Sequence, residues 1–200
     1  ARASTTDAEA TVMKMGDGGF RPAYNPQLAS DVDSLVIVGV EVATAGSDQG
    51  QMVPMIEQVR ERCGQAPEAW LVDGGFVGHQ QVEQASAHTT VYGPVPAAKD
   101  KTVDPHQPKP DDSPAVAAWR ARMGTDEAKA IYKNRAATAE CVNAQSRNRG
   151  LQQFRVRGLA KVKCVVLFFA LAHNLMRMAS LAPEMLALGK GASAVSGIGA

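Results

Sequence analysis

The sequence predicts an α/β fold in which a mixed sheet, three antiparallel strands followed by parallel strands, is flanked by helices. Three observations support this prediction. Short runs rich in valine and threonine, separated by turn residues, fill the segment from residue 4 to residue 43. Strand and helix patterns then alternate as far as residue 93, and the second half of the chain is mainly helical. Short connections favour an antiparallel meander, whereas helical crossovers favour parallel pairing.

The first three predicted strands form the meander. Residues 4 to 13 have the composition of a short strand that contains Asp7, and a glycine-rich turn follows. Residues 20 to 29 form the second strand, and Asp31 to Ser34 form a tight turn. The third strand covers residues 35 to 43, and alternation places four of its side chains on one face: Val36, Val38, Val40 and Val42.

A helix, a strand and a second helix are expected next. Ser47 is the predicted N-cap of the first helix and Gly64 its terminator, with Met52, Met55, Ile56 and Val59 on the buried face. The strand from residue 68 to 72 leads into Asp73, and residues 77 to 87 form the next helix. Asp73 therefore lies at the carboxyl end of a strand, where open sheets usually bind ligands.

The remaining elements begin with a strand from Thr89 to Gly93. A proline-rich polar insertion over about residues 97 to 125 follows, which we expect to be flexible, with a short helix that starts at Ser113-Pro114. Thr125 is the predicted cap of a long helix that ends near Gly150.

The last predicted helix runs from about residue 159 to 179. Its expected buried stripe consists of Val162, Val165, Val166, Phe169 and Met176. Residues 181–200 are expected to form a flexible tail.

Length and composition describe an ordinary globular chain: 200 residues, 45% hydrophobic and 20% charged. One domain over residues 1–180 is expected, and because the first residue is Ala1 and not Met, we expect an N-terminal region to be missing. No signal peptide is present in the first twenty residues, and the apolar run 164–172 is too short to cross a bilayer. These features predict a soluble, intracellular protein.

The three cysteines, Cys63, Cys141 and Cys164, are too widely spaced for a disulfide framework or a zinc site. Each is expected to be a small buried apolar residue. The four histidines are equally scattered and receive no catalytic role.

The net charge of +1 conceals an uneven distribution. Between residues 132 and 177 there are nine Lys or Arg residues and one acid, Glu140, which gives 9 − 1 = +8 and leaves 1 − 8 = −7 for the rest. Concentrated positive charge attracts a phosphate backbone. The asymmetry therefore favours nucleic acid as a partner, although a merely soluble basic helix pair would show it as well.

The long helix carries the most informative pattern. At about 100° per residue, Tyr132, Arg135, Glu140, Asn143 and Arg147 fall within an arc of roughly 140°. One carboxylate thus sits among cations and hydrogen-bonding groups. A solvated helix face with intrahelical ion pairs explains the same pattern equally well on this helix alone.

The order of the predicted elements is that of the ribonuclease-H-like fold, and four blocks of sequence resemble the DDE transposases of bacterial insertion sequences. The spacing of Tyr132, Arg135, Glu140 and Arg147 resembles their Tyr-Arg-Glu-Lys signature, with Arg147 in place of the lysine. The other blocks are Ser4 to Ala10, Gly19 to Asn25 and Leu71 to Phe76. The resemblance extends over about residues 1 to 180.

This resemblance implies the catalytic and metal-binding residues. Asp7, Asp73 and Glu140 would bind Mg²⁺ or Mn²⁺, because hard cations prefer carboxylate oxygens. The enzyme would hydrolyse phosphodiesters at the element ends and join them to target DNA through the 3′-hydroxyl. Double-stranded DNA would contact Tyr132 and five arginines, namely Arg135, Arg147, Arg149, Arg155 and Arg157. The resemblance further implies a bacterial cytoplasmic protein that associates with the nucleoid and forms a homodimer on DNA.

Several alternatives stay open. Asp31 is an alternative first carboxylate, although turn formation explains it more simply. Asp48 and Glu41 are interpreted as a cap and a solvent-facing residue. A truncated or decayed remnant that binds DNA without cutting it is the second functional hypothesis. A dinucleotide site at Asp73-Gly74-Gly75 is disfavoured, because no G-x-G-x-x-G follows the strand.

Overall fold

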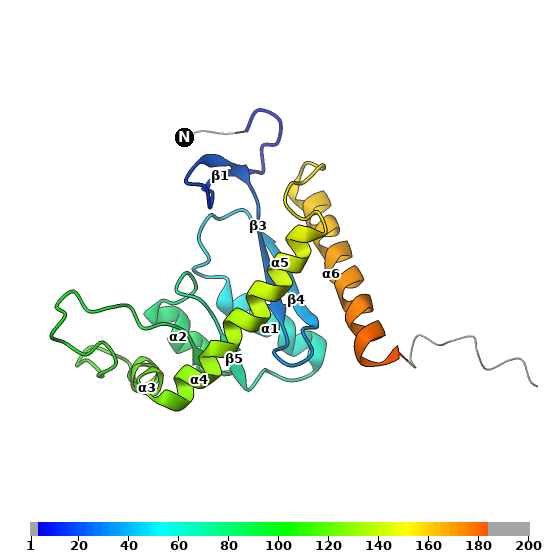
Figure 1. The fold of residues 1–200 in the computed structure, drawn as a ribbon. Helices are drawn as coiled ribbons and strands as arrows, with labels where there is room; N and C mark the ends of the chain where they lie inside the picture. The colour runs from blue at the N-terminus through cyan, green and yellow to red at the C-terminus, as the bar shows by residue number, and fades with distance from the viewer. Residues whose placement is uncertain (1–3, 184–200) are drawn as a thin grey trace, which may run out of the picture.

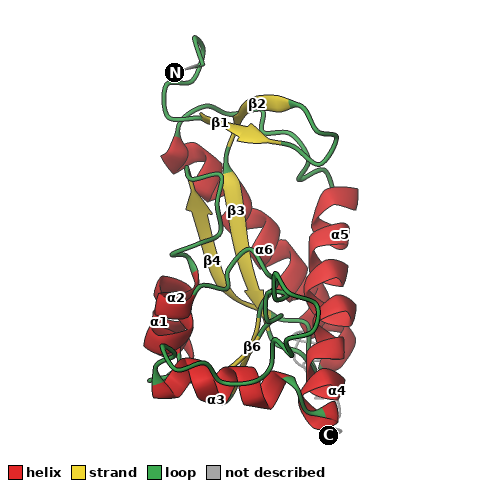
Figure 2. Cartoon of the chain, turned by 90° about the vertical axis from the view of Figure 1, so that its left-hand side faces the viewer, coloured by secondary structure: helices red, strands yellow, loops and turns green. Residues whose placement is uncertain are grey.

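Six strands form three separate two-stranded sheets in the computed structural model, which describes residues 4–183 (Figures 1 and 2). The antiparallel pairs are β1 (Thr11–Lys14) with β2 (Phe20–Ala23), and β3 (Asn25–Ser30) with β4 (Ile37–Ala43). The parallel pair is β5 (Ala69–Leu71) with β6 (Thr90–Tyr92). The α/β class is confirmed, but among these residues the antiparallel and parallel strands are not joined into the predicted single sheet.

The predicted first strand forms only at its end. Residues 4 to 10 are instead held in turns by their own side chains: Ser4 Oγ accepts from the Asp7 amide at 3.0 Å, and Asp7 Oδ1 accepts from the Glu9 amide at 3.3 Å. Serine and aspartate offer the backbone such local partners in place of a ladder. The predicted second strand is divided at Tyr24 into β2 and β3.

The predicted face of four valines does not form on β4, and Val36 lies before the strand. Val40 and Val42 pack in one apolar cluster, whereas Val38 packs with Met55 and Val59 in another. The pairing of β3 with β4 is irregular between Ala29 and Ser30, so residues before and after that point face opposite sides.

Helix α1 (Met52–Cys63) covers one face of the β3–β4 sheet. Its four predicted core residues, Met52, Met55, Ile56 and Val59, are all buried, and Gly64 ends it with a φ of 77°. The helix begins four residues later than predicted, because Ser47 Oγ accepts from the nearby Gln49 amide and Gln51 is the N-cap. Helix α2 (His79–Ala85) follows β5.

The long helix is confirmed with one irregularity. It comprises α4 (Asp126–Arg135), a π-helical turn (Ala136–Glu140) and α5 (Cys141–Asn148). Thr125 Oγ1 caps it by accepting from the Ala128 amide at 3.2 Å, as predicted. A π turn inserts an extra residue, so side chains beyond it are rotated relative to a regular α-helix.

Helix α6 (Leu159–Leu181) packs on the face of β4 that carries Val40 and Val42. Its buried residues are Val162, Val166, Ala170 and His173. The predicted stripe is therefore wrong in part: Val165 and Phe169 are half-buried, and Met176 is 43% exposed. Several large apolar side chains also face outward, among them Leu167, Phe168, Leu171 and Leu175.

The length and apolar composition of α6 would suffice to cross a membrane, with a mean hydropathy of 1.6 over its most apolar window. Mostly buried core helices of soluble proteins meet the same criterion, and 17% of this window is buried inside the structure. Polar side chains attach the helix to the sheet: Asn174 bonds both the amide and the carbonyl of Ile37 at 2.8 Å, and Lys163 pairs with Glu41 at 2.8 Å.

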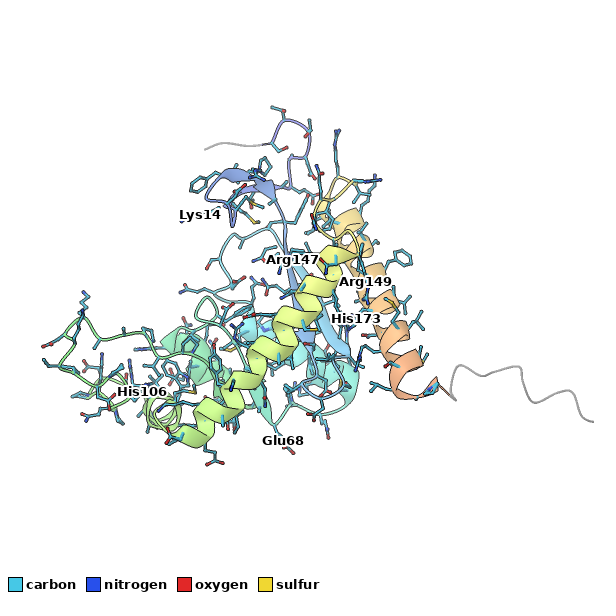
Figure 3. All side chains as sticks on the ribbon, viewed as in Figure 1. Lys14, Glu68, His106, Arg147, Arg149 and His173 are labelled. Atoms are coloured by element: carbon cyan, nitrogen blue, oxygen red, sulfur yellow. The ribbon has the colours of Figure 1, made fainter. Side chains whose placement is uncertain are left out.

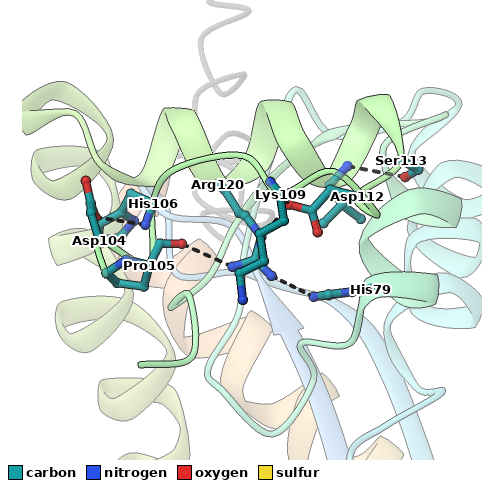
Figure 4. A network of polar contacts seen from close by, with 9 residues as sticks. His79, Asp104, Pro105, His106, Lys109, Asp112, Ser113 and Arg120 are labelled. Atoms are coloured by element: carbon teal, nitrogen blue, oxygen red, sulfur yellow. Dashed lines mark hydrogen bonds and ion pairs between the residues drawn. The ribbon is translucent and has the colours of Figure 1, made fainter. Parts of the chain in front are cut away.

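The proline-rich insertion leads into α3 (Pro114–Met123), whose predicted Ser113 cap is confirmed. Arg120 of this helix is 4% exposed and ties the insertion down (Figure 4). Its guanidinium pairs with Asp112 at 2.7 Å, donates to the Pro105 carbonyl at 3.1 Å and contacts His79 Nε2 at 3.0 Å. This part of the insertion is therefore anchored by a buried ion pair.

The prediction of buried cysteines is wrong for two of the three. Cys63 and Cys164 are exposed and Cys141 is half-buried, and all three are free thiols. Of the predicted tail, residues 184–200 lie outside the described part of the chain.

Candidate functional site

A cavity of about 890 Å³ lies between β3 and β5. Helix α1 contributes Met52, Met55 and Val59 to one wall, and the α4–α5 helix contributes the opposite wall. Figure 1 shows that long helix crossing in front of the strands. Carboxylates line both ends of the cavity, and Arg135 is the basic residue in its lining.

Asp73 and Asp48 lie together at one end of this cavity. Asp73 follows β5, and its Oδ1 accepts from the Gly75 amide at 2.8 Å. A Cβ atom placed on Gly75 would lie 3.0 Å from Asp48 Oδ2 and 3.1 Å from Asp73 Oδ1. The two carboxylates therefore flank one glycine, which leaves room between them that a side chain at position 75 would fill.

Amide side chains from β3 hold Asp48 in place. Asn25 Nδ2 and Gln27 Nε2 both donate to Asp48 Oδ1, at 2.8 and 2.7 Å, and Gln27 is buried. Asp48 Oδ2 receives no such bond and faces Gly75. Asp48 is not the helix cap that its sequence position predicts, because the helix starts at Met52 and the carboxylate lines the cavity.

Asp7 lies elsewhere, between Tyr24 and the start of α6. The Tyr24 hydroxyl is 2.9 Å from both of its carboxylate oxygens, and the Gly158 amide donates to Oδ2 at 3.0 Å. The bond from Gly158 holds the pKa of Asp7 below its usual value. These contacts give Asp7 a structural role, in which it joins the N-terminal segment to the last helix.

Glu140 is on the π turn and its side chain is 64% exposed. Arg135 Nη2 contacts Glu140 Oε1 at 3.3 Å, and the same guanidinium lies 5.8 Å from the Tyr132 ring. Four residues of this helix line the cavity, namely Arg135, Thr138, Ala139 and Asn143, and Glu140 is not one of them. The intrahelical ion pair that the sequence left open is thus formed.

The predicted metal triad is not assembled in this structure. Among residues 4–183, no three His, Cys, Asp or Glu side chains converge in a way that could hold a metal ion. Asp48 and Asp73 provide carboxylate oxygens of the type that Mg²⁺ and Mn²⁺ prefer, but they are two ligands and not three. The assignment of Asp7, Asp73 and Glu140 to one metal site stays a prediction.

Asp31, the alternative first carboxylate, lines the other end of the cavity. Its Oδ1 accepts from the Ser34 hydroxyl at 2.6 Å and from the Ser34 amide at 2.7 Å. These bonds lower the pKa of Asp31. The geometry is that of a turn-forming aspartate, which agrees with the simpler explanation drawn from the sequence.

The predicted DNA contacts fall into two groups. Tyr132 and Arg135 pack against the protein, where Tyr132 borders the core cluster that contains Trp119. By contrast, four arginines are exposed around the end of α5 and the loop to α6: Arg147, Arg149, Arg155 and Arg157. Figure 3 shows Arg147 and Arg149 at this end of α5. We call these four residues the basic corner.

Comparison with known families adds one finding. Residues 98–179 match the family described as Transposase DDE domain. This segment contains α3, the long helix and most of α6, and so includes Glu140 and the basic corner. No curated protein and no solved structure matches the chain.

Proposed function

We propose that the chain is a DNA transposase of an insertion sequence, because residues 98–179 match the Transposase DDE domain family. The proposed reaction is metal-dependent hydrolysis of phosphodiesters at the element ends, followed by strand transfer through the 3′-hydroxyl. Double-stranded DNA is the proposed substrate. The family match over residues 98–179 is the observation that supports this proposal.

The chemistry of the cavity end supports a divalent cation. Asp48 Oδ2 and Asp73 Oδ2 receive no hydrogen bond from described residues, and both are hard oxygen donors. Asn25 and Gln27 orient Asp48 through its other oxygen, as supporting residues commonly orient metal-binding carboxylates. A bound Mg²⁺ or Mn²⁺ would supply Lewis-acid activation of a phosphodiester.

Asp73 is common to both candidate ligand sets. The set implied by the family resemblance adds Asp7 and Glu140, whereas the geometry adds Asp48. For Asp7 to bind a metal, its carboxylate would have to leave Tyr24 and Gly158, and Glu140 would have to leave Arg135. Measurements on single variants can separate the two sets.

We propose to measure Mn²⁺ binding by calorimetry for the parent chain and for Asp7→Asn, Asp48→Asn, Asp73→Asn and Glu140→Gln. Asp126→Asn is the matched control, because the Asp126 side chain is fully exposed and pairs only with Lys129. Loss of binding in Asp73→Asn together with Asp48→Asn would support the ligands at the cavity end. Loss in Asp7→Asn and Glu140→Gln would support the triad. A folded parent that binds no Mn²⁺ would contradict both.

The remnant hypothesis is the second candidate, and one observation favours it. No group of three carboxylates is formed among residues 4–183, while the exposed basic corner remains able to contact phosphates. A remnant would bind duplex DNA equally well with and without Mn²⁺ and would not nick it. Fluorescence anisotropy with a labelled duplex, and gel analysis of the same samples, distinguish this outcome from metal-dependent cleavage.

A further inference from the structure

Strand β3 has one edge that no other strand within residues 4–183 covers. The amides of Val40 and Val42 point away from β3, since they donate to the side chains of Gln58 and Glu41. Their partners across the ladder, Leu28 and Pro26, must therefore direct their own backbone groups away from β4. Every residue of β3 lines the cavity, so this edge faces the cavity.

Strand β5 presents a second edge of the same kind. The Thr90 amide donates to the Glu68 carbonyl, and the Val72 amide donates to the Tyr92 carbonyl. In a parallel ladder, this pattern means that the backbone N–H and C=O of Trp70 point toward β6. The backbone groups of Ala69 and Leu71 then point to the other side of β5. Both residues also line the cavity.

The two edges run in opposite directions. Asp48 binds Asn25 at the start of β3, and it lies beside Gly75, just after the end of β5. At the far end, the turn after β3 and the segment before β5 both line the cavity, through Asp31, Asp33 and Glu68. A strand between them would thus be parallel to one neighbour and antiparallel to the other.

The outer edge of β4 shows the opposite situation. Gln58 of α1 accepts from the Val40 amide at 2.7 Å, and Asn174 of α6 binds the backbone of Ile37. Side chains from α1 and α6 therefore cover the β4 edge of this sheet. Exposed edges are normally covered, charged or paired, so the uncovered edges at the cavity need an explanation.

We propose that the cavity between β3 and β5 accepts an extended polypeptide strand, which joins the two sheets into one. β3 is six residues long, and a guest strand of about five or six residues would span about 17–20 Å. Backbone hydrogen bonds from both edges would hold the guest, in the manner of β-strand addition. This inference does not depend on the proposed transposase activity.

The cavity walls define the chemistry of the guest. Alternate side chains would face Met52, Met55 and Val59 on α1 and must be apolar. The intervening side chains would face the small and polar residues of the long helix, such as Thr138 and Asn143.

Charge at the two ends selects a polypeptide over nucleic acid. Five carboxylates line the cavity ends, namely Asp31, Asp33, Asp48, Glu68 and Asp73, against one cation, Arg135. Without a bound cation, this arrangement repels phosphates and favours a guest with lysine or arginine at its termini.

The test uses a synthetic peptide of about seven residues that alternates valine with serine and ends in lysine on both sides. Amide hydrogen exchange reports its position. We expect the amides of Leu28 and Leu71, which face the cavity, to exchange at least about tenfold more slowly when the peptide is bound. The amides of Gln27 and Trp70, which face β4 and β6, serve as internal controls and should not change.

Peptide N-methylation tests whether the guest uses both edges. One peptide is methylated on the valine amides and another on the serine amides, so that each loses donors on one edge only. A guest inserted between two edges should bind at least about tenfold more weakly in both cases. Equal binding of all three peptides would overturn the proposal, because it would indicate an apolar ligand and not a strand.

Two variants at one position complete the test. Leu28→Pro removes the amide that faces the cavity, and Pro26 shows that this edge tolerates a proline. Leu28→Ala keeps the amide and trims only the side chain. We expect peptide binding to be lost in the first and kept in the second; the N-methylated peptides decide if Leu28→Pro fails to fold. No binding to the parent chain, or an edge already protected in a dimer of the chain, would refute the proposal.

Discussion

The hydroxyl of Tyr24 lies 2.9 Å from both carboxylate oxygens of Asp7. Tyr24 itself is 9% exposed, and its ring packs edge-on against Phe154 in the loop before α6. This pair connects the N-terminal segment, the start of β3 and the last helix. Its two members also have pKa values shifted in opposite directions: the Gly158 amide chiefly lowers the pKa of Asp7, whereas burial chiefly raises the pKa of Tyr24.

Burial, and then the hydrogen bond and negative charge of Asp7, raise the pKa of Tyr24 to about 12 from an ordinary value of 10.0. The hydroxyl should therefore stabilise the fold fully below pH 10, and this contribution should be lost as the pH rises toward about 12. The near-ultraviolet absorbance of the parent and of Tyr24→Phe is measured as a function of pH. The difference between the two titration curves reports the ionisation of Tyr24 alone. Asp7→Asn should lower its pKa only in part, because burial remains; a Tyr24 titration near the ordinary value in the parent would contradict the prediction.

Arg120 is expected to be the most destabilising arginine to replace. Arg120→Leu leaves Asp112, whose side chain is 3% exposed, as a buried unpaired charge. Breaking such a pair costs about 3–5 kcal/mol, which urea denaturation would detect. Arg21→Ala is the matched control, because the Arg21–Asp17 pair is more than half exposed and should change stability by less than about 1 kcal/mol. The double variant Arg120→Leu with Asp112→Leu removes the buried charge as well. If it is no more stable than Arg120→Leu alone, the unpaired charge of Asp112 does not cause the loss of stability.

Local signals in the sequence predicted many elements correctly. Ser113, Thr125 and Gly64 act as caps or terminators in the structure, because a cap depends on residues only three or four positions away. The prediction of a strand that begins at Ser4 was wrong for a similar local reason, because Ser4 and Asp7 accept hydrogen bonds from neighbouring amides. The face reversal at Val38 could not be read from alternation, because the irregularity lies in its pairing with β3.

The candidate site was harder to predict than the fold. Asp48 and Asp73 are 25 positions apart in the sequence, and they meet only because β3, through Asn25 and Gln27, orients one of them. The sequence feature that could have identified Asp48 as a site residue was its position in the polar segment that follows β4. Glu140 was expected to share a face with Arg135 and Asn143 on a regular helix, but the π turn between them changes the rotation of that helix.

Gly39 is a position where any side chain should destabilise the sheet. A Cβ atom there would lie 2.5 Å from Met55 Sδ and 3.0 Å from Ala29 Cβ, between α1 and β4. Gly39→Ala should therefore lower the free energy of unfolding by about 1–3 kcal/mol through overpacking. Gly16→Ala is the control, since nothing lies within 4 Å of its Cβ position. A thermal melt that shifts equally in both variants would show that contact with Met55 is not responsible.

The basic corner should determine the salt dependence of DNA binding. Arg155 and Arg157 are exposed in the loop between α5 and α6, and no ion pair within residues 4–183 neutralises them. If both contact phosphates, Arg155→Ala with Arg157→Ala should weaken duplex binding and reduce the slope of log K against log salt by about 0.9 for each lost contact. Anisotropy titrations with a labelled duplex at several salt concentrations measure this slope.

Arg60→Ala with Arg62→Ala is the matched control, because these arginines lie on α1, across the β3–β4 sheet from α6. An equal loss in the two double variants would mean that DNA responds to net charge alone, and that the end of α5 is not its binding surface.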